Sequence, residues 1–327
     1  MRPSPRETAV VDALMTNFSL AYMQSVENFV APTVFPVVSV ALESGVYAVY
    51  PKGFFLRTEM AARPLGGRPR QAGYTVESKS YRVEEYALEK AIDDRIRRNS
   101  RDPLGPDRGA VRFLSANALI HREVEWAARF FATGIWTTEL TGVAAGPGAN
   151  QILQFNQAGS SPLSVAQNVK TRLKLATGYD PNVLVVGQDV HSVLVNHPEI
   201  VERIKYSQLG VVTNDLLAQF FGVDEYRVAG AVQNIAKEGQ VDQLAFIANP
   251  KAMLFAYATD NPSTEEPTAG AIFAWDDLVP GQTNELGGVI ERYRDDRAHS
   301  DYYQIRNAWD MRATATDLAV FVNNAVA

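Results

Sequence analysis

The stretch from Asp107 to Trp136 constrains the fold more than any other part of the chain. It contains no proline, and its apolar residues recur every three or four positions, as on one face of a helix: Phe113, Ala116, Ile120, Val124, Ala127, Phe131 and Ile135. Asp107 is the expected N-cap, and Gly134 is the expected stop. At about 1.5 Å per residue the helix would be roughly 40 Å long. The sequence therefore predicts either a long core helix or a spine on which a sheet-containing domain is laid.

Composition limits the class of protein. The chain has 327 residues, of which 46% are hydrophobic and 21% charged, as in an ordinary globular protein of one large domain or two modest ones. The net charge of −6 lacks the basic excess of a general nucleic-acid binder. The absence of cysteine excludes disulfides, thiolate metal sites and cysteine nucleophiles. We find no apolar signal core near Met1 and no apolar run long enough to span a membrane, and we expect no membrane association.

Residues 1–44 are expected to form an N-terminal arm. Pro3 and Pro5 keep its start extended, and Val10 to Val30 has roughly helical apolar spacing. A proline-broken apolar run follows from Pro32 to Val40. Because such a segment cannot bury its own apolar side chains, we expect it to lie against the body of the chain or against a neighbour.

Residues 45–88 are expected to form a long two-stranded excursion. Gly45–Phe55 and Tyr74–Tyr86 have the β-branched and aromatic residues of strands, and Gly66-Gly67 marks the turn at the tip. The tip carries four arginines and one acidic residue: Arg57, Arg63, Arg68, Arg70 and Glu59. Two interpretations remain open, a solvated basic loop or a surface that docks on an acidic patch of another subunit. Because an isolated hairpin is at best marginally stable in water, we expect this one to need a partner surface.

The rest of the chain mixes helices and strands, so the expected fold class is α+β. A short helix is expected over Glu89–Asn99, and a loose small-residue stretch over Gly142–Gly159. The expected capped or proline-initiated helices run from Ser161-Pro162 to Gly178, from His197-Pro198 onward, and from Thr213 to Gly222. The expected strands are Asn182–Gly187, Tyr226–Val232, Leu244–Ala248, Ala252–Tyr257, Ala271–Trp275, Val289–Arg294 and Tyr302–Met311.

A search for catalytic constellations returns little. The sequence has no phosphate-binding glycine loop, no Gly-x-Ser-x-Gly elbow and no His-Glu-x-x-His pair. The one dense group of potential ligands is Asp295, Asp296, His299 and Asp301, which suits a solvated turn between two strands better than a metal site. His191 and His197 are interpreted as surface or capping residues, and His121 as a helix-face residue. We therefore assign no catalytic residue, metal ligand or cofactor, and expect no enzyme.

The order of these parts resembles the major capsid protein of tailed bacteriophages, the HK97-like capsid fold that encapsulin shells share. Phe35-Pro36-Val37-Val38 followed by Gly45-Val46-Tyr47 is similar to the family's entry into its extended loop. Gly66-Gly67, Tyr81 and Glu85–Glu89 resemble the tip and the return of that loop. The resemblance continues through a later set of stretches: Val183–Val186, the helix after His197-Pro198, and Leu217–Gly222 followed by Val228.

The resemblance implies a division of labour along the chain. An N-terminal arm (1–44) would cross a neighbour, and an extended loop (45–88) would lie over an adjacent subunit. A peripheral domain (89–175 and 288–312) would be built on the spine helix (107–136). An axial domain (176–287) would meet its copies around fivefold and sixfold positions, and residues 313–327 would form a C-terminal segment.

The function that the resemblance implies is structural. The chain would self-assemble as hexamers and pentamers into an icosahedral shell, part of a virion built in the host cytoplasm, that encloses double-stranded DNA contacted without sequence preference. The implied partners are a portal, a separate scaffolding protein and a decoration protein. Arg57, Arg63, Arg68 and Arg70 are the expected inter-subunit contacts. Two alternatives stay open, an encapsulin that encloses a cargo protein and a soluble α/β enzyme without a recognisable motif.

Overall fold

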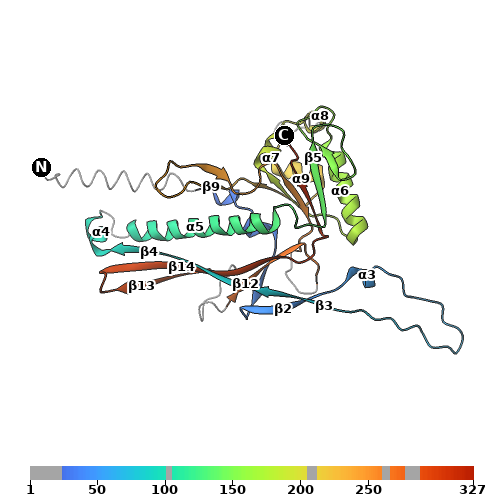
Figure 1. Ribbon diagram of the computed structural model, residues 1–327, viewed down its shortest axis with the longest axis horizontal. Coiled ribbons are helices and arrows are strands. Elements are labelled where there is room, and N and C mark those ends of the chain that lie inside the picture. The colour runs from blue at the N-terminus through green and yellow to red at the C-terminus, as the bar shows by residue number, and fades with distance from the viewer. Residues whose placement is uncertain (1–23, 101–104, 205–211, 260–265, 277–287) are drawn as a thin grey trace.

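The computed structural model describes residues 24–100, 105–204, 212–259, 266–276 and 288–327. Within these residues the chain is α+β, as expected. A long helix lies along a five-stranded sheet, and a second lobe is built on a six-stranded sheet (Figure 1). A hairpin continued by a long loop leaves the five-stranded sheet and extends to the far end of the molecule.

The five-stranded sheet is organised around its longest strand, β14 (Ser300–Ala313). On one side β14 pairs with β4 (Glu84–Asp93). On the other side β13 (Gly288–Asp295) pairs with its first half and β12 (Gly270–Trp275) with its second half. These pairings are antiparallel, and β1 (Val37–Val40) adds to β12 in parallel. Two segments of the N-terminal third of the chain therefore flank strands from its C-terminal third.

The expected spine helix exists as α5 (Gly105–Phe130), but its predicted ends at Asp107 and Trp136 are wrong. Asp107 lies inside the first turn rather than at the N-cap. After Phe130 the chain turns back, and the indole N–H of Trp136 donates to the carbonyl of Phe130 at 2.8 Å. This bond satisfies a carbonyl that a helix end leaves without a partner, so a tryptophan predicted to continue the helix instead helps to end it.

The predicted apolar stripe of α5 is correct only at and just beyond its C-terminal end, where Ala127 and Phe131 are buried, because the helix packs different faces at its two ends. In the N-terminal half, Ala110 and Leu114 are buried against the sheet beside Ile92 and Tyr303. In the C-terminal half, Trp126 and Phe130 lie in a separate and larger core. Phe113, expected on the buried stripe, is 48% exposed. A single buried stripe would need one packing surface along the whole helix, whereas α5 packs against different segments at its two ends.

The second lobe contains a mixed six-stranded sheet. Its order is β6 (Gln151–Leu153), β5 (Thr138–Val143), β15 (Ala319–Asn323), β11 (Met253–Ala256), β7 (Val183–Gly187) and β8 (Glu225–Ala229). Its helices are α6 (Pro162–Thr177), α7 (Gln188–Val195), α8 (Pro198–Ile204) and α9 (Asn214–Phe221). Leu184 and Val186 of β7 face the core that these helices complete, whereas Val183 and Val185 face the core shared with α5. Alternate residues of the strand thus join two different cores, as the pleat requires.

Helix caps in this lobe agree with the sequence. Ser161 Oγ accepts the N–H of Ser164 at the start of α6, and Gly178 ends that helix with φ of +85°. Thr213 caps α9 in the same way, and Gly222 ends it with φ of +60°. Both glycines occupy the left-handed region that other residues rarely adopt.

Several other boundaries need correction. The helix expected at Glu89–Asn99 is correct only from α4 (Asp94–Asn99), because Glu89 to Asp93 continue β4 opposite Gln304 to Ser300. The expected loose stretch Gly142–Gly159 contains β6 and the end of β5. The strand expected at Tyr226–Val232 divides into β8 and β9 (Val232–Asn234), and β9 pairs with β10 (Leu244–Phe246). The helix α7 was not predicted.

The ranges expected for the two domains do not follow the sheets. β5, β6 and nearly all of α6 precede residue 176 but belong to the six-stranded lobe, together with β15 from the C-terminal segment. β12 falls within 176–287 but belongs to the five-stranded sheet. Domains defined as contiguous ranges cannot describe this arrangement, because each sheet contains strands from distant parts of the chain.

Candidate functional site

The hairpin β2–β3 forms the base of the expected extended loop. β2 (Ser44–Val49) pairs antiparallel with β3 (Glu77–Arg82), which confirms two strands at this position. Both are shorter than expected, because Lys52–Phe55 form a helix and the second strand begins only at Glu77. Tyr81 stacks on Phe273 of β12 with ring centroids 4.8 Å apart, and Tyr47 lies 5.3 Å from the same ring. A Cβ atom on Gly45, opposite Tyr81, would come within 2.6 Å of the Tyr81 hydroxyl. A residue without a side chain at position 45 therefore lets the hairpin rest on the five-stranded sheet.

Beyond the base, the loop has little packing of its own. The short helix α3 (Lys52–Phe55) contributes Phe55 to an aromatic group with Tyr50 and Tyr74, whose ring centroids are 5.3 to 6.1 Å apart. Lys52 forms an ion pair with Asp317, which ties this part of the loop to the segment before β15. All three aromatic residues remain more than one-third exposed. The aromatic group thus orders the near half of the loop and leaves apolar surface uncovered.

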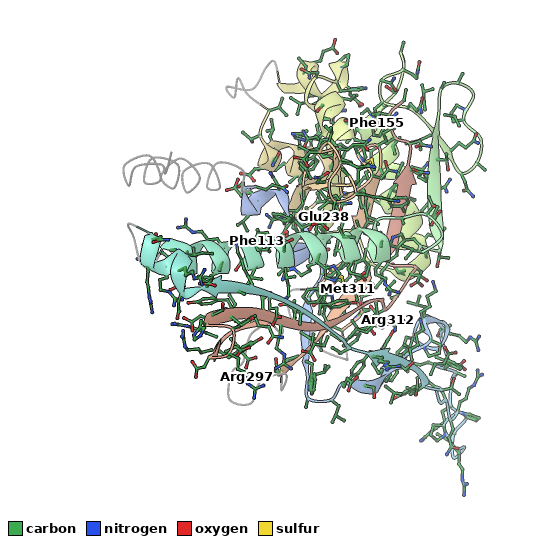
Figure 2. All side chains as sticks on the ribbon, turned by 60° about the vertical axis from the view of Figure 1, so that its left-hand side comes forward. Phe113, Phe155, Glu238, Arg297, Met311 and Arg312 are labelled. Carbon is green, nitrogen blue, oxygen red and sulfur yellow. The ribbon has the colours of Figure 1, made fainter. Side chains whose placement is uncertain are left out.

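The far half of the loop stands clear of the rest of the subunit (Figure 2). Gly66 has φ of +78°, and the N–H of Gly67 donates to the carbonyl of Pro64 at 3.0 Å, so the expected turn is present. Met60 is 96% exposed, and Leu65 is fully exposed. Isolated apolar residues on a surface are ordinary, but two near the tip of a loop that has no core are suited to contact with another molecule.

The structure divides the four expected contact arginines into two pairs. Arg70 lies 2.8 Å from Glu59 and Arg57 lies 3.7 Å from it, so one carboxylate engages both. Arg63 and Arg68 are exposed, and within the described part of the chain neither has an ion-pair partner. The unpaired positive charge of the tip therefore belongs to Arg63 and Arg68.

A buried glutamate that the sequence did not reveal fixes the N-terminal arm. Glu123 of α5 accepts the N–H of Val30 at 3.1 Å and that of Ala31 at 2.9 Å, at the start of α2 (Ala31–Val34). Burial raises the pKa of Glu123, and the two N–H groups and Arg122 oppose that rise. The only available signal was a charged pair, Arg122-Glu123, in the apolar half of a helix.

Aromatic packing completes the anchor of the arm. Phe35, just after α2, lies 4.6 Å from the Phe130 ring and within 6.5 Å of two tryptophan rings. The preceding turn, η1 (Val26–Asn28), has no buried residue. Residues 10–23 of the helix expected over Val10–Val30 lie outside the described chain. The arm therefore meets the body first at Gln24, which accepts the N–H of Val232 at 2.8 Å, and packs into it at Phe29, Val30, Ala31, Val34 and Phe35, which are buried.

The acidic cluster near residue 300 is engaged by arginines. Asp301 has a 4% exposed side chain and lies 2.5 Å from Arg97, 2.8 Å from Arg292 and 3.5 Å from Arg294. Burial would raise the pKa of Asp301, but hydrogen bonds from Arg292 and Arg97 outweigh it, and the pKa is lowered. Asp295 accepts the N–H of Arg297 in the turn between β13 and β14. In the described ranges no group of three or more potential ligands is placed to hold a metal ion.

The histidines take structural places. His197 accepts the N–H of Glu199 at the start of α8 and contacts Ser160 at 3.1 Å, as expected of a capping residue. His191 lies 2.9 Å from the Tyr226 hydroxyl, and burial lowers its pKa. His121 of α5 packs against the rings of Tyr86 and Trp309. In the described part of the chain, no helix combines the length and hydropathy needed to cross a membrane.

Comparison with known proteins gives one curated relative and several similar folds. The chain is 30% identical over 230 residues to the major capsid protein of Burkholderia phage BcepMu, which covers 68% of this chain and 70% of that protein. No family model matches the sequence.

Solved structures extend the likeness to nearly the whole chain. A phage-related protein from Bordetella bronchiseptica RB50 superposes with a TM-score of 0.69 at 20% identity, over 96% of this chain and 97% of that one. The mature capsid protein of bacteriophage PhiM1 gives a TM-score of 0.55 at 13% identity, over 92% and 88% of the two chains. These structures share the HK97-like fold, with its spine helix, two sheets and projecting hairpin. The sequence identity to the BcepMu protein indicates common ancestry as well as a shared fold. This chain therefore belongs to the phage major capsid protein family and is a structural subunit of a capsid shell.

Proposed function

We propose that the chain self-assembles, through hexamers and pentamers, into an icosahedral shell that encloses the double-stranded DNA genome of a tailed phage. The observation that carries this proposal is the projecting loop, which exposes Met60, Leu65 and two unpaired arginines with no core of its own. A closed shell needs contacts in several directions, and projecting segments that bury themselves on neighbours supply them. The chemistry is association, and the proposal assigns no catalytic step.

The two-sheet architecture supports a division close to the one expected from sequence. The peripheral domain comprises α4, α5 and the five-stranded sheet. The extended loop, expected over residues 45–88, ends at Val83 because β4 begins at Glu84, and the base of the loop rests on β12. The axial domain comprises the six-stranded sheet and its helices, including β5, β6, α6 and β15. The arm (1–44) crosses a neighbour with the part that precedes Gln24, because Gln24 accepts the N–H of Val232 and Glu123 binds Val30 and Ala31 within the same subunit.

The proposed partners follow from this role. The chain binds copies of itself first, and a portal and a separate scaffolding protein guide closure of the shell in the host cytoplasm. A decoration protein then covers the outside of the virion. Packaged DNA is contacted without sequence preference. An encapsulin of the same fold would enclose a cargo protein instead, so the contents of the particle distinguish the two assignments.

The first experiment is negative-stain electron microscopy of the protein expressed alone, with sedimentation in parallel. Closed shells, or sheets and tubes of capsid-like lattice, are expected, and nuclease-protected DNA is expected when the neighbouring phage genes are co-expressed. A small discrete oligomer in both experiments would contradict the proposal. Particles that contain a bound protein and no DNA would favour the encapsulin.

The loop tip gives a sharper test. We predict that Arg63→Glu together with Arg68→Glu impairs assembly or lowers the dissociation temperature of the shells, because both charges meet acidic residues of a neighbouring subunit. The matched comparison is Arg63→Gln/Arg68→Gln against Arg57→Gln/Arg70→Gln, which removes the same charge from the same loop. The second pair loses contacts to Glu59 within the loop, so its shells should be less affected. Shells of unchanged yield and stability in the charge-reversal variant would contradict the predicted contact.

A further inference from the structure

The end of the molecule that carries α4 and the start of α5 is basic within an acidic chain. Residues 90–112 contain seven lysines and arginines against four aspartates, whereas the whole chain has a net charge of −6. In Figure 1 this end lies opposite the projecting loop, where α4 packs beside the first turns of α5. The charge is therefore separated in space from the arginines of the loop tip.

The described acidic residues of this segment are already engaged. Both carboxylate oxygens of Asp94 accept hydrogen bonds from Arg294, at 3.1 and 2.9 Å. Asp107 lies 2.8 Å from Arg97, which also binds Asp301 of β14. Asp93 accepts the N–H of Arg95 and caps α4. Asp94 and Asp107 thus hold α4, α5 and the sheet together, and the negative charges of both are paired with arginines.

Four cations remain on the outside: Lys90, Arg95, Arg98 and Arg112. All four are exposed, and in the described ranges none has an ion-pair partner. Because Arg97 points inward to Asp107, Arg95 and Arg98 project from the other side of the single α4 segment. The Lys90 ammonium lies 4.6 Å from the Phe113 ring centroid, next to Arg112 on α5. We call these four residues the basic surface.

The basic surface continues along a side of α5 that is free only in its N-terminal half. Farther along the helix, α2 and its buried neighbours cover the face that carries Glu123 and Trp126. At Arg112 and Phe113 no such cover is present among the described residues, and Phe113 is visible at this part of the helix in Figure 2. Ile96 and Phe113 are also exposed beside these residues, but the four cations outnumber them, so a partner that binds mainly through charge fits this surface.

We propose that the basic surface contacts the phosphates of the enclosed DNA duplex, an inference that rests on the proposed function. Guanidinium groups match phosphate oxygens in pairs, and three of the four cations are arginines. Four cations give weak, salt-dependent binding without base recognition, which suits DNA that must be packed densely and later released. The acidic balance of the rest of the chain limits tighter binding elsewhere.

The test compares the full-length chain with Arg95→Gln/Arg98→Gln/Arg112→Gln in binding to a short fluorescent DNA duplex over a range of salt concentrations. The slope of log K against log salt should become shallower by about 2 to 3, because each lost phosphate contact removes about 0.9 from it. At about 0.1 M salt the affinity should fall at least about tenfold. Conversion of the same positions to lysine should largely keep the slope, since charge is retained.

The matched control is Lys79→Gln/Arg82→Gln/Lys237→Gln, which changes net charge equally at exposed positions on β3 and on the β9–β10 turn. Its slope should stay near the wild-type value. An unchanged slope in the arginine variant, or an equal change in the control, overturns the proposal.

Shell formation is scored in parallel by electron microscopy. Loss of shells with an unchanged slope would assign the surface to an acidic patch of a neighbouring copy, which also overturns it. Failure of the wild-type chain to form shells would count against the proposed function, while the duplex slopes still decide the role of the surface.

Discussion

At the scale of single residues, Glu123 joins two segments that are far apart in the sequence. Its carboxylate replaces the capping side chain that α2 lacks, since Val30 at the N-cap offers no side-chain acceptor. The position is buried, so water cannot accept hydrogen bonds from the two N–H groups if the carboxylate is removed. One residue of the spine helix thus determines where the arm joins the body of the subunit.

We predict that Glu123→Ala destabilises the unassembled subunit by about 3 kcal/mol, because two buried donors lose their acceptor. Urea unfolding of the purified subunit measures this difference. Glu125→Ala is the control on the same helix. It removes an i,i+4 pair with Arg129 at 3.8 Å and should cost less than about 0.5 kcal/mol. Equal losses in the two variants would show that the arm contact contributes nothing special.

Glu123 should also give a pH-dependent stability. Burial raises its pKa in the folded state, so the folded chain binds this proton more tightly than the unfolded chain does. Its contribution is therefore most favourable below the unfolded pKa of about 4.3 and declines as pH rises through the folded pKa. The free energy of unfolding of wild type minus that of Glu123→Gln should fall between about pH 4 and pH 7. A difference that is flat or rises over this range would contradict the predicted direction.

At the scale of elements, close approaches of backbone decide which glycines the strands and helices require. A Cβ on Gly142 of β5 would lie 1.9 Å from the carbonyl oxygen of Asn324, just after β15. A Cβ on Gly109, in the exposed part of α5, meets nothing within 4 Å. Packing therefore requires glycine at position 142 in the strand, whereas no contact requires it at position 109 in the helix.

We predict opposite signs for two glycine-to-alanine changes. Gly142→Ala should destabilise the subunit by at least about 2 kcal/mol, because the β5–β15 junction must move apart. Gly109→Ala should stabilise it by about 0.5 to 1 kcal/mol, since alanine loses less backbone entropy in a helix. Thermal unfolding of both variants beside wild type tests the pair. Stabilisation by Gly142→Ala would show that the approach to Asn324 relaxes without cost.

At the scale of the whole molecule, the two sheets share a core. Trp126, Phe130 and Phe131 of the spine region pack with Val185 and Phe321 of the six-stranded sheet and with Ile272 and Met311 of the five-stranded sheet. Met311 lies on β14 below the helix in Figure 2. The division into peripheral and axial parts is therefore one of topology, because apolar contacts run continuously between them.

We predict that the two parts unfold together. Tryptophan fluorescence, to which Trp126, Trp136 and Trp309 of the shared core contribute together with Trp275, should follow the same denaturant transition as far-ultraviolet circular dichroism. Phe130→Ala should cost about 3 to 5 kcal/mol and separate the two transitions, because it removes packing between the parts. Leu194→Ala is the control, since Leu194 is buried among the helices of the six-stranded lobe alone. Two transitions in the wild-type subunit would contradict a shared core.

The sequence by itself determined the features that depend on a few neighbouring residues. The caps at Ser161 and Gly178 and the turn at Gly66 follow from local rules of hydrogen bonding and backbone sterics. The order of these parts was enough to indicate the capsid fold.

Only the tertiary structure decided which partners each element meets. The end of α5 at Phe130 depends on a tryptophan that folds back onto it, and its two buried faces depend on a sheet and an arm from other parts of the chain. Glu123 binds Ala31 of the arm, 92 residues away in the sequence, and Asp301 binds Arg97, 204 residues away. Local periodicity indicates whether a residue faces an apolar or a polar environment. It carries no information on which distant segment of the chain provides that environment. For that reason the spine was predictable from sequence, whereas the anchor of the arm, the arginine network and the basic surface emerged only from the fold.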